Sequence, residues 1–332
     1  MIFMLNAYPN RIFTISPPWI DTVIKKRLEF ALKMAQGKIP IEGLINISLE
    51  TNSLSLFLKT LIYSLSTNKE IGELLTNITG GNVRSVIDLV RSFIGSPNVD
   101  AEKIIEIMEY EGQYLIPVHE FSKSALLGDY SHFNPDSSVA MNIFDVFFPD
   151  TKEHFLVPIT LAFLNTKGNH KDKNGFVQTS ELIEELQSFG YLVEQIEISL
   201  RRSTNKKLIE TSQRVTFEED ETGLIGDMPI SFRLTSVGAY HFNRWMCSFG
   251  YLDAMVFDTP VFDKEVYENL SKNLESLQIG HRFDRTVSFK KYLLSCWANM
   301  VTVPAYIDFN EILSLGEKSF SQVQKVLNSN YG

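Results

Sequence analysis

The order of short segments between residues 151 and 250 constrains the fold more than any other feature of the sequence. An apolar helix is predicted over about 151–165, and a charged loop then leads to a short extended segment at 176–177. Two helices follow, with Thr179 as the candidate cap of the first and a turn at Gly190 between them, and the second is predicted over about 192–204. An extended segment, an acidic loop, a second extended segment and a helix that begins near Ser236 complete the pattern.

This is the order of a winged helix-turn-helix, in which a helix, a short strand, a helix, a turn, a helix and a two-stranded wing follow one another. A winged helix-turn-helix is therefore the fold expected for residues 151–250. When this fold binds DNA, the second helix of the turn lies in the major groove. Four cations at the end of that helix are therefore candidate nucleic-acid contacts: Arg201, Arg202, Lys206 and Lys207.

The same unit carries features that oppose binding to duplex DNA. Glu194 and Glu197 lie in the leading half of the predicted helix, the half that usually meets the bases. The wing tip at 218–221 is acidic at every position, whereas DNA binding depends on cations that displace counterions from phosphates. A protein-interaction or oligomerisation role is favoured for this unit, with direct DNA binding and a purely structural role as alternatives.

Residues 1–111 read as a short strand followed by a small all-helical unit. The strand is expected at 11–15, and Ser16 is the candidate N-cap of the first helix. Asp100 is the candidate cap of the last one. Before this last helix, apolar residues at helical spacing predict four helices, over about 19–35, 52–66, 68–77 and 82–94.

The turn before the fourth of these helices has the composition of a phosphate-binding loop. Gly80 and Gly81 tolerate positive φ, Asn82 follows them, and Arg84 lies on the first turn of the helix. However, the pattern GxxxxGK[ST] that defines a P-loop occurs nowhere in the chain. The alternative reading is that Arg84 simply shares a polar helix face with Asp88 and Arg91 and pairs there.

Residues 11–245 resemble the helical lid and winged helix that follow the nucleotide core in AAA+ ATPases, above all in the origin-recognition and STAND-like branches. The segments RIFTISPPWIDTVIKKRL and ITGGNVRSVIDL carry this resemblance. Within it, Gly80, Gly81, Asn82 and Arg84 match the sensor 2 motif, whose arginine reaches the γ-phosphate in such enzymes. The resemblance therefore implies a nucleotide-sensing role for these residues when a nucleotide core is present.

The chain departs from that family in one respect: the Walker A loop, the Walker B acid and the sensor 1 strand are absent. No cofactor and no catalytic residue are expected for this chain alone, and ATP with magnesium is implied only for a parent or partner protein. A fragment, a split gene and a degenerate relative would each produce this pattern.

The resemblance implies a non-catalytic regulatory region of a bacterial P-loop ATPase, with an ATPase core or like subunits as partners. Some bacterial ATPases of this general kind are thought to act in phage defence. A free-standing winged-helix regulator that binds DNA is the alternative function.

The remaining segments complete a mainly α (α+β) fold class. Residues 112–150 have proline and glycine punctuation and many aromatics, as expected of an ordered connector, and residues 251–332 read as a helical C-terminal region. The chain has 44% hydrophobic residues and a net charge of −9, so it is a globular protein but not a general binder of polyanions.

Metal, disulfide and membrane chemistry are not expected. Cys247 and Cys296 match no metal spacing and suggest no disulfide scaffold, so a reducing, cytoplasmic location is predicted. His119, Glu120 and His132 lack the spacing of a zinc-binding helix. No apolar stretch is long enough to cross a bilayer.

Overall fold

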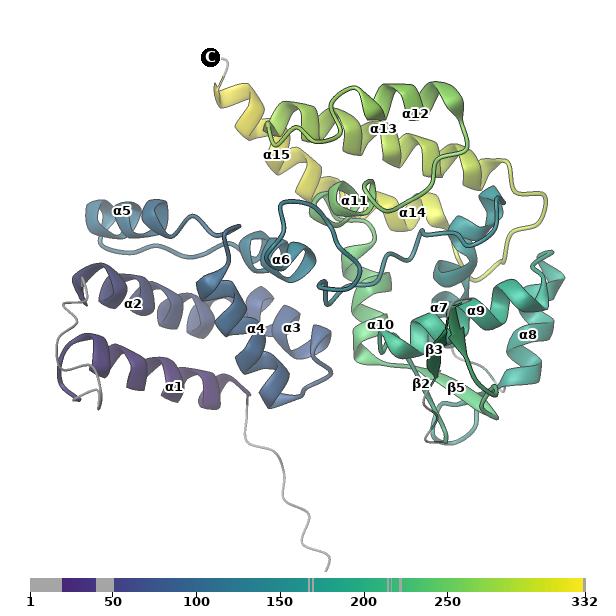
Figure 1. The fold of residues 1–332 in the computed structure, drawn as a ribbon, viewed down its shortest axis with the longest axis horizontal. Helices are drawn as coiled ribbons and strands as arrows, with labels where there is room; N and C mark the ends of the chain where they lie inside the picture. Colours follow the sequence, from purple (N-terminus) through teal and green to yellow (C-terminus); the bar gives the residue numbers. More distant parts are fainter. Residues whose placement is uncertain are drawn as a thin grey trace, which may run out of the picture.

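The computed structural model describes residues 20–39, 51–166, 168, 170–213, 215, 217–220 and 223–330. Over these residues the fold is mainly helical with small antiparallel sheets, as the fold class predicts. The strand expected at 11–15 and the Ser16 cap lie outside the described residues. Figure 1 shows the N-terminal helices on one side, the sheet on the other and the C-terminal helices packed above.

The first five helices match the predicted helical unit closely. Their apolar residues recur at helical spacing and are buried on one face. The side chain of Asp100 accepts a hydrogen bond from Lys103 N, which confirms the predicted cap. The bounds are α1 Ile20–Ala35, α2 Thr51–Thr67, α3 Lys69–Ile78, α4 Val83–Gly95 and α5 Ala101–Glu111.

The connector contains a helix that the sequence patterns did not reveal. Helix α6, Val118–Leu127, packs against α3 and α4 on one side. Phe121 of α6 stacks on Phe93 of α4, with ring centroids 3.8 Å apart. The rest of the connector, 128–150, has no helix or strand, but residues 140–144 within it are buried and belong to the core.

The second helical region begins with a 3-10 turn and is built around a small antiparallel sheet. The sheet has strand order β1-β5-β2, with Val177 opposite Phe232 and Ile209 opposite Leu234. The bounds are η1 Thr151–Phe155, α7 Leu156–Asn165, β1 Val177–Gln178, α8 Thr179–Ser188, α9 Val193–Asn205, β2 Ile209–Thr211 and β5 Ser231–Leu234.

Two local features of this region differ from expectation. The acidic loop is not irregular throughout, because β3, Glu218–Asp220, pairs with β4, Gly223–Ile225, in a separate hairpin. Thr179 was expected to cap α8, but it is the first residue of that helix, and its hydroxyl donates to Pro229 O at 2.5 Å. Thr179 therefore ties the start of α8 to the loop before β5.

A helical segment links the sheet to both neighbouring regions. It runs from α10, Ser236–Tyr240, through a π-helical turn, η2 His241–Trp245, to α11, Phe249–Met255. A Cβ atom on Gly238 would lie 2.1 Å from Leu208 O, so only glycine allows α10 to sit this close to the start of β2. Helix α10 packs on α3, and α11 packs on α6.

The C-terminal region is helical, as predicted, and an ionic cluster attaches it to α11. Asp253 is 5% exposed and accepts hydrogen bonds from Arg282 and Arg285. Arg285 also donates to three backbone carbonyls, those of Asn273, Leu274 and Ser276. The helices are α12 Lys264–Ser271, α13 Ile279–Ala298, α14 Phe309–Ser314 and α15 Glu317–Asn330.

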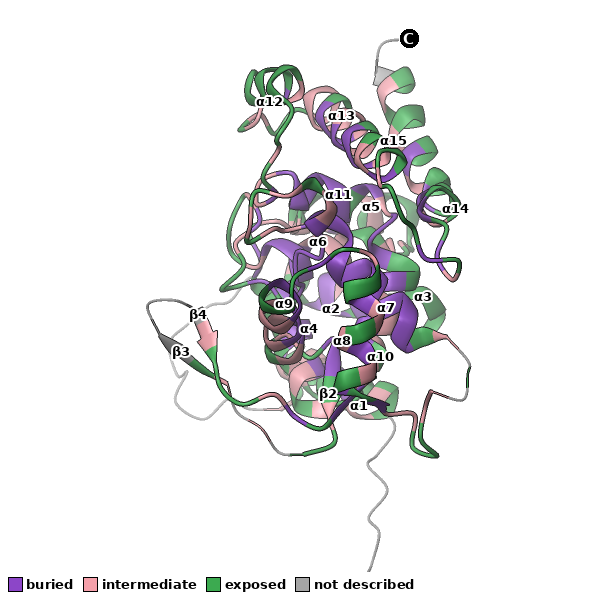
Figure 2. Ribbon diagram, turned by 90° about the vertical axis from the view of Figure 1, so that its right-hand side faces the viewer, coloured by how far each residue is buried: buried purple, intermediate pink, exposed green. Residues whose placement is uncertain are grey.

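One buried core runs through all of these regions. It extends from Ile24 of α1 to Phe320 of α15, and Figure 2 shows the buried segments grouped along the middle of the molecule. Large aromatic side chains such as Phe144, which meets Phe289 and Phe309 edge to face, join the connector to the C-terminal helices. Among the described helices, none is both long and apolar enough to cross a membrane.

Candidate functional site

The turn between α3 and α4 holds Arg84 at the start of a helix. Gly80 and Gly81 have φ angles of 61° and 75°, which glycine adopts without strain. The side chain of Asn82 caps α4 by accepting a hydrogen bond from Ser85 N at 3.1 Å. The residues singled out in the sequence thus act together as a turn and cap that fix the direction of the helix.

Arg84 itself points away from the protein interior. It is exposed, and within the described residues it makes no hydrogen bond or ion pair. Asp88 and Arg91, on the same helix, are also exposed, and no ion pair among the described residues joins the three. The structure therefore leaves the Arg84 guanidinium available, and mutual pairing on this helix face does not occupy it.

The two arginines of α9 are used inside the molecule. Arg201 pairs with Glu197 one turn earlier at 2.9 Å and donates to Gly226 O at 3.2 Å, which attaches the β3–β4 hairpin to α9. Arg202 pairs with Asp145 of the connector. Both side chains therefore have partners that hold neighbouring segments against the helix.

The two lysines after α9 differ from each other. The ammonium of Lys206 donates to the carbonyls of Pro135 and Ser138, the latter at 3.2 Å, and burial lowers its pKa. Lys207 is exposed, and its backbone carbonyl accepts a hydrogen bond from the Thr235 hydroxyl at 2.6 Å. No bond from the Lys207 ammonium occurs within the described residues. Of the four predicted nucleic-acid contacts, only Lys207 has a side chain without an internal partner among the described residues.

The leading end of α9 is apolar and acidic. Leu192 and Val193 are 61% and 41% exposed, and Glu194 beside them is exposed too. Below them, Gln195 accepts from Leu192 N and donates to the buried carboxylate of Glu153. Burial raises the pKa of that carboxyl. A surface of this composition suits contact with protein better than contact with the polyanionic edge of DNA.

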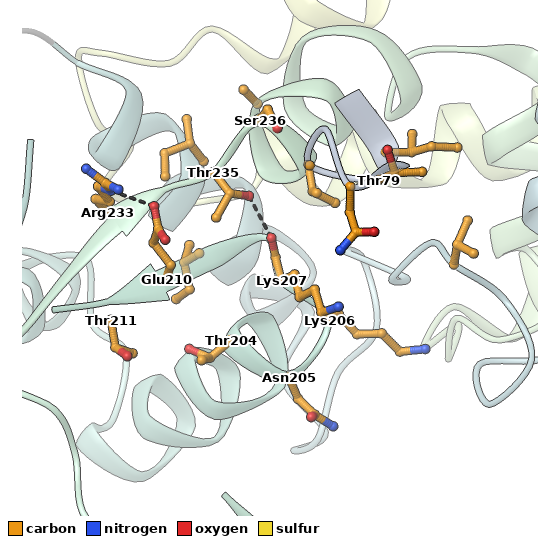
Figure 3. A pocket seen from close by; sticks show the side chains of 18 of the residues that line it. Thr79, Thr204, Asn205, Lys206, Lys207, Glu210, Thr211, Arg233, Thr235 and Ser236 are labelled. Carbon is orange, nitrogen blue, oxygen red and sulfur yellow. Dashed lines mark hydrogen bonds and ion pairs between the residues drawn. The ribbon is translucent and has the colours of Figure 1, made fainter. Parts of the chain in front are cut away.

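An open groove of about 1510 Å³ lies between the α3–α4 turn and the end of α9 (Figure 3). The turn contributes Thr79, Gly80 and Asn82, and the segment after α9 contributes Lys206 and Lys207. The two predicted sites, which are more than a hundred residues apart in sequence, thus border one groove. Arg84 is not among the residues that line it.

Metal sites are not found among the described residues, where no group of three or more histidine, cysteine, aspartate or glutamate side chains converges. His119 lies 3.5 Å from Glu120, and His132 stacks on Phe257. Cys247 and Cys296 are both free thiols.

Sequence reasoning missed the groove and the partners of the α9 cations. Lys207 has φ of 60°, the only positive value at a non-glycine position in the described chain. Lys207 lies two residues after the end of α9, where glycine or asparagine is usual, and this position was the available sign of a left-handed backbone there.

Comparisons with protein-family profiles, with curated proteins and with solved structures find no match to this chain.

Proposed function

We propose that the chain is a non-catalytic regulatory region that works with a P-loop ATPase core of the AAA+ or STAND-like type. In this proposal residues 1–111 act as the helical lid and residues 151–250 as a winged helix. The observation that carries the proposal is Arg84, an exposed guanidinium on the first turn of a capped helix, with no partner among the residues that the structure describes. Such a group is suited to bind a phosphate on a second polypeptide.

Contacts between α3 and α10 support a coupling role. Ser236 of α10 donates to Asn77 O of α3 at 3.5 Å, and Arg244 of η2 pairs with Glu73 of α3 at 3.2 Å. A displacement of the α3–α4 turn would therefore press on the segment that follows the sheet. Through it, the state of a nucleotide at Arg84 would reach the proposed winged helix.

The surface of α9 supports a protein partner for that unit. Arg201, Arg202 and Lys206 have internal partners, and the exposed leading end presents Leu192 and Val193 next to acidic residues. These features support an interaction role over the alternative of a free-standing DNA-binding regulator.

The test is reconstitution with a P-loop ATPase core, taken from the gene nearest to this one in its genome. We expect the pair to hydrolyse ATP and Arg84→Ala to lower the rate of the pair at least about tenfold, because the arginine would stabilise charge on the γ-phosphate. Arg91→Ala, a second exposed arginine on the same helix, is the matched control and should leave the rate unchanged.

Two results would contradict the proposal. One is a pair in which Arg84→Ala hydrolyses ATP as fast as the unmodified chain does. The other is tight, magnesium-dependent binding of ATP by the 332-residue chain alone, since it would place a complete nucleotide site within this sequence.

A further inference from the structure

The groove between the α3–α4 turn and the end of α9 has an unusual charge for this protein. Lys171, Lys206 and Lys207 line it, and Arg233 lines it as well but pairs with Glu210 at 2.5 Å. The chain as a whole has a net charge of −9. A concave surface that gathers cations in an acidic protein concentrates a local positive potential.

Two of the three lysines are held in place by neutral partners. Lys171 donates to Leu164 O at 2.6 Å, and Lys206 donates to Ser138 O at 3.2 Å. Carbonyl groups orient an ammonium but do not neutralise it, so both charges still act on the groove. Asp88, on the opposite wall, is the one acidic lining residue among those described that has no cationic partner.

Lys207 takes the left-handed conformation of a helix C-terminal cap, in which its N–H and that of Leu208 bond back to Thr204 O and Ser203 O at 2.9 and 2.8 Å. A left-handed conformation costs a residue with a Cβ atom on the order of 1 kcal/mol relative to glycine. The hydrogen bond from Thr235 uses only the Lys207 carbonyl, which any residue would supply. The lysine side chain is therefore not needed for the fold at this position, and it borders the groove without a partner in the described part of the chain (Figure 3).

The uncharged lining residues narrow the class of ligand. About half of them have hydroxyl or amide side chains, which hydrogen-bond to hydroxyl groups. No aromatic side chain occurs among the described lining residues, so these residues offer no stacking surface of the kind that bases of a nucleic-acid strand use. The hydroxyl and amide residues include Thr79, Asn82, Ser85, Asn165, Asn174, Thr204, Asn205, Thr211 and Ser236.

We propose that this groove binds a small phosphorylated compound that carries hydroxyl groups, with Lys207 as its principal phosphate contact. Lys206 and Lys171 also line the groove and add positive charge, and the α3–α4 turn supplies amide and hydroxyl groups. A ligand here would bridge the N-terminal helices and the sheet. The site is separate from Arg84 and does not depend on an ATPase partner.

The test is calorimetric titration of the full chain with inorganic tripolyphosphate and with ribose 5-phosphate, at constant ionic strength. We expect both probes to bind, and Lys207→Asn to weaken binding about tenfold, because one charge-assisted hydrogen bond is lost. Lys173→Asn removes an exposed lysine from the nearby loop, outside the lining, and should leave the affinity unchanged.

Asparagine and glycine both tolerate the left-handed backbone, so the variants separate binding from folding. Lys207→Asn and Lys207→Gly should unfold at a temperature no lower than that of the unmodified chain. The proposal is overturned if neither probe binds up to about 1 mM, or if Lys207→Asn binds as the unmodified chain does. It is also overturned if a single strand of about 15 nucleotides binds while the two small probes do not.

Discussion

The turn before α4 and the end of α9 both carry cationic side chains, but these side chains differ in whether they have partners inside the protein. Arg84 stands exposed on a capped helix with no internal partner in the described chain. Arg202, from the other region, lies against Asp145 of the connector, and Lys206 lies against connector carbonyls. Both regions look like phosphate contacts in the sequence. Packing decides which cation a ligand can reach: Arg84 is left free in the first region, and in the second only Lys207 has an ammonium without an internal partner among the described residues.

Arg285 extends this comparison to a cation that is buried and bonded inside the protein. It is 5% exposed, and its removal would leave the buried carboxylate of Asp253 with Arg282 as its one charged partner. We expect Arg285→Ala to lower the free energy of unfolding by about 3 kcal/mol or more. Urea denaturation measures this, and a loss below about 1 kcal/mol would contradict the structure. Arg285→Lys should lose less, because it keeps the charge.

The side chain of His241 bonds to the connector, and it predicts that the stability of the fold depends on pH. Its Nδ1–H donates to Val237 O, and its Nε2 accepts from Met141 N, so a second ring proton has no room there. Burial, with a contribution from the charge of Lys206, lowers the pKa of His241 from 6.5 to about 4.

Because the unfolded chain takes up this proton at a higher pH than the folded chain, the stabilisation is complete above about pH 6.5. It is lost between about pH 6.5 and pH 4, by about 3 kcal/mol in total. Urea titrations across that range should show a steep slope that His241→Gln reduces. An equal slope in the two proteins would rule out His241 as the cause.

Arg202→Ala tests whether the ion pair between α9 and the connector stabilises the fold. The pair with Asp145 is largely removed from solvent, with side chains 32% and 20% exposed, so we expect a loss of about 1–2 kcal/mol. A double-mutant cycle with Asp145→Asn isolates the pair. A coupling energy near zero would show that the arginine does not hold the connector.

Arg84→Ala should have the smallest effect on stability. An exposed side chain without a partner contributes within about 0.5 kcal/mol in either direction. Urea denaturation beside Arg202→Ala makes the comparison direct. A loss of more than about 1 kcal/mol would reveal an internal role for Arg84 and would weaken the proposed nucleotide contact.

Local patterns predicted the helices well because their causes are local. The apolar spacing within α1, α3 and α4 and the caps at Asn82 and Asp100 are set by residues within one or two turns. The positive φ at the double glycine follows from glycine alone.

The partners of the charged residues could not be predicted in the same way. Arg202 and Asp145 are 57 residues apart, and nothing in the spacing of either residue indicates the other. Helix α6 was not predicted because its short segment lies between Pro117 and Gly128, and proline and glycine at these positions are also typical of a connector. The groove depends on how the N-terminal helices meet the sheet, which is a property of tertiary packing.

The most direct test of the difference between the two regions is a titration of the unmodified chain with a duplex of about 20 base pairs. Fluorescence anisotropy at about 50 mM salt would detect non-specific binding, which such low salt strengthens. With the cations of α9 bound internally and the leading end acidic, we predict no complex up to about 10 μM protein. A complex in that range whose affinity falls steeply as salt rises would contradict the account.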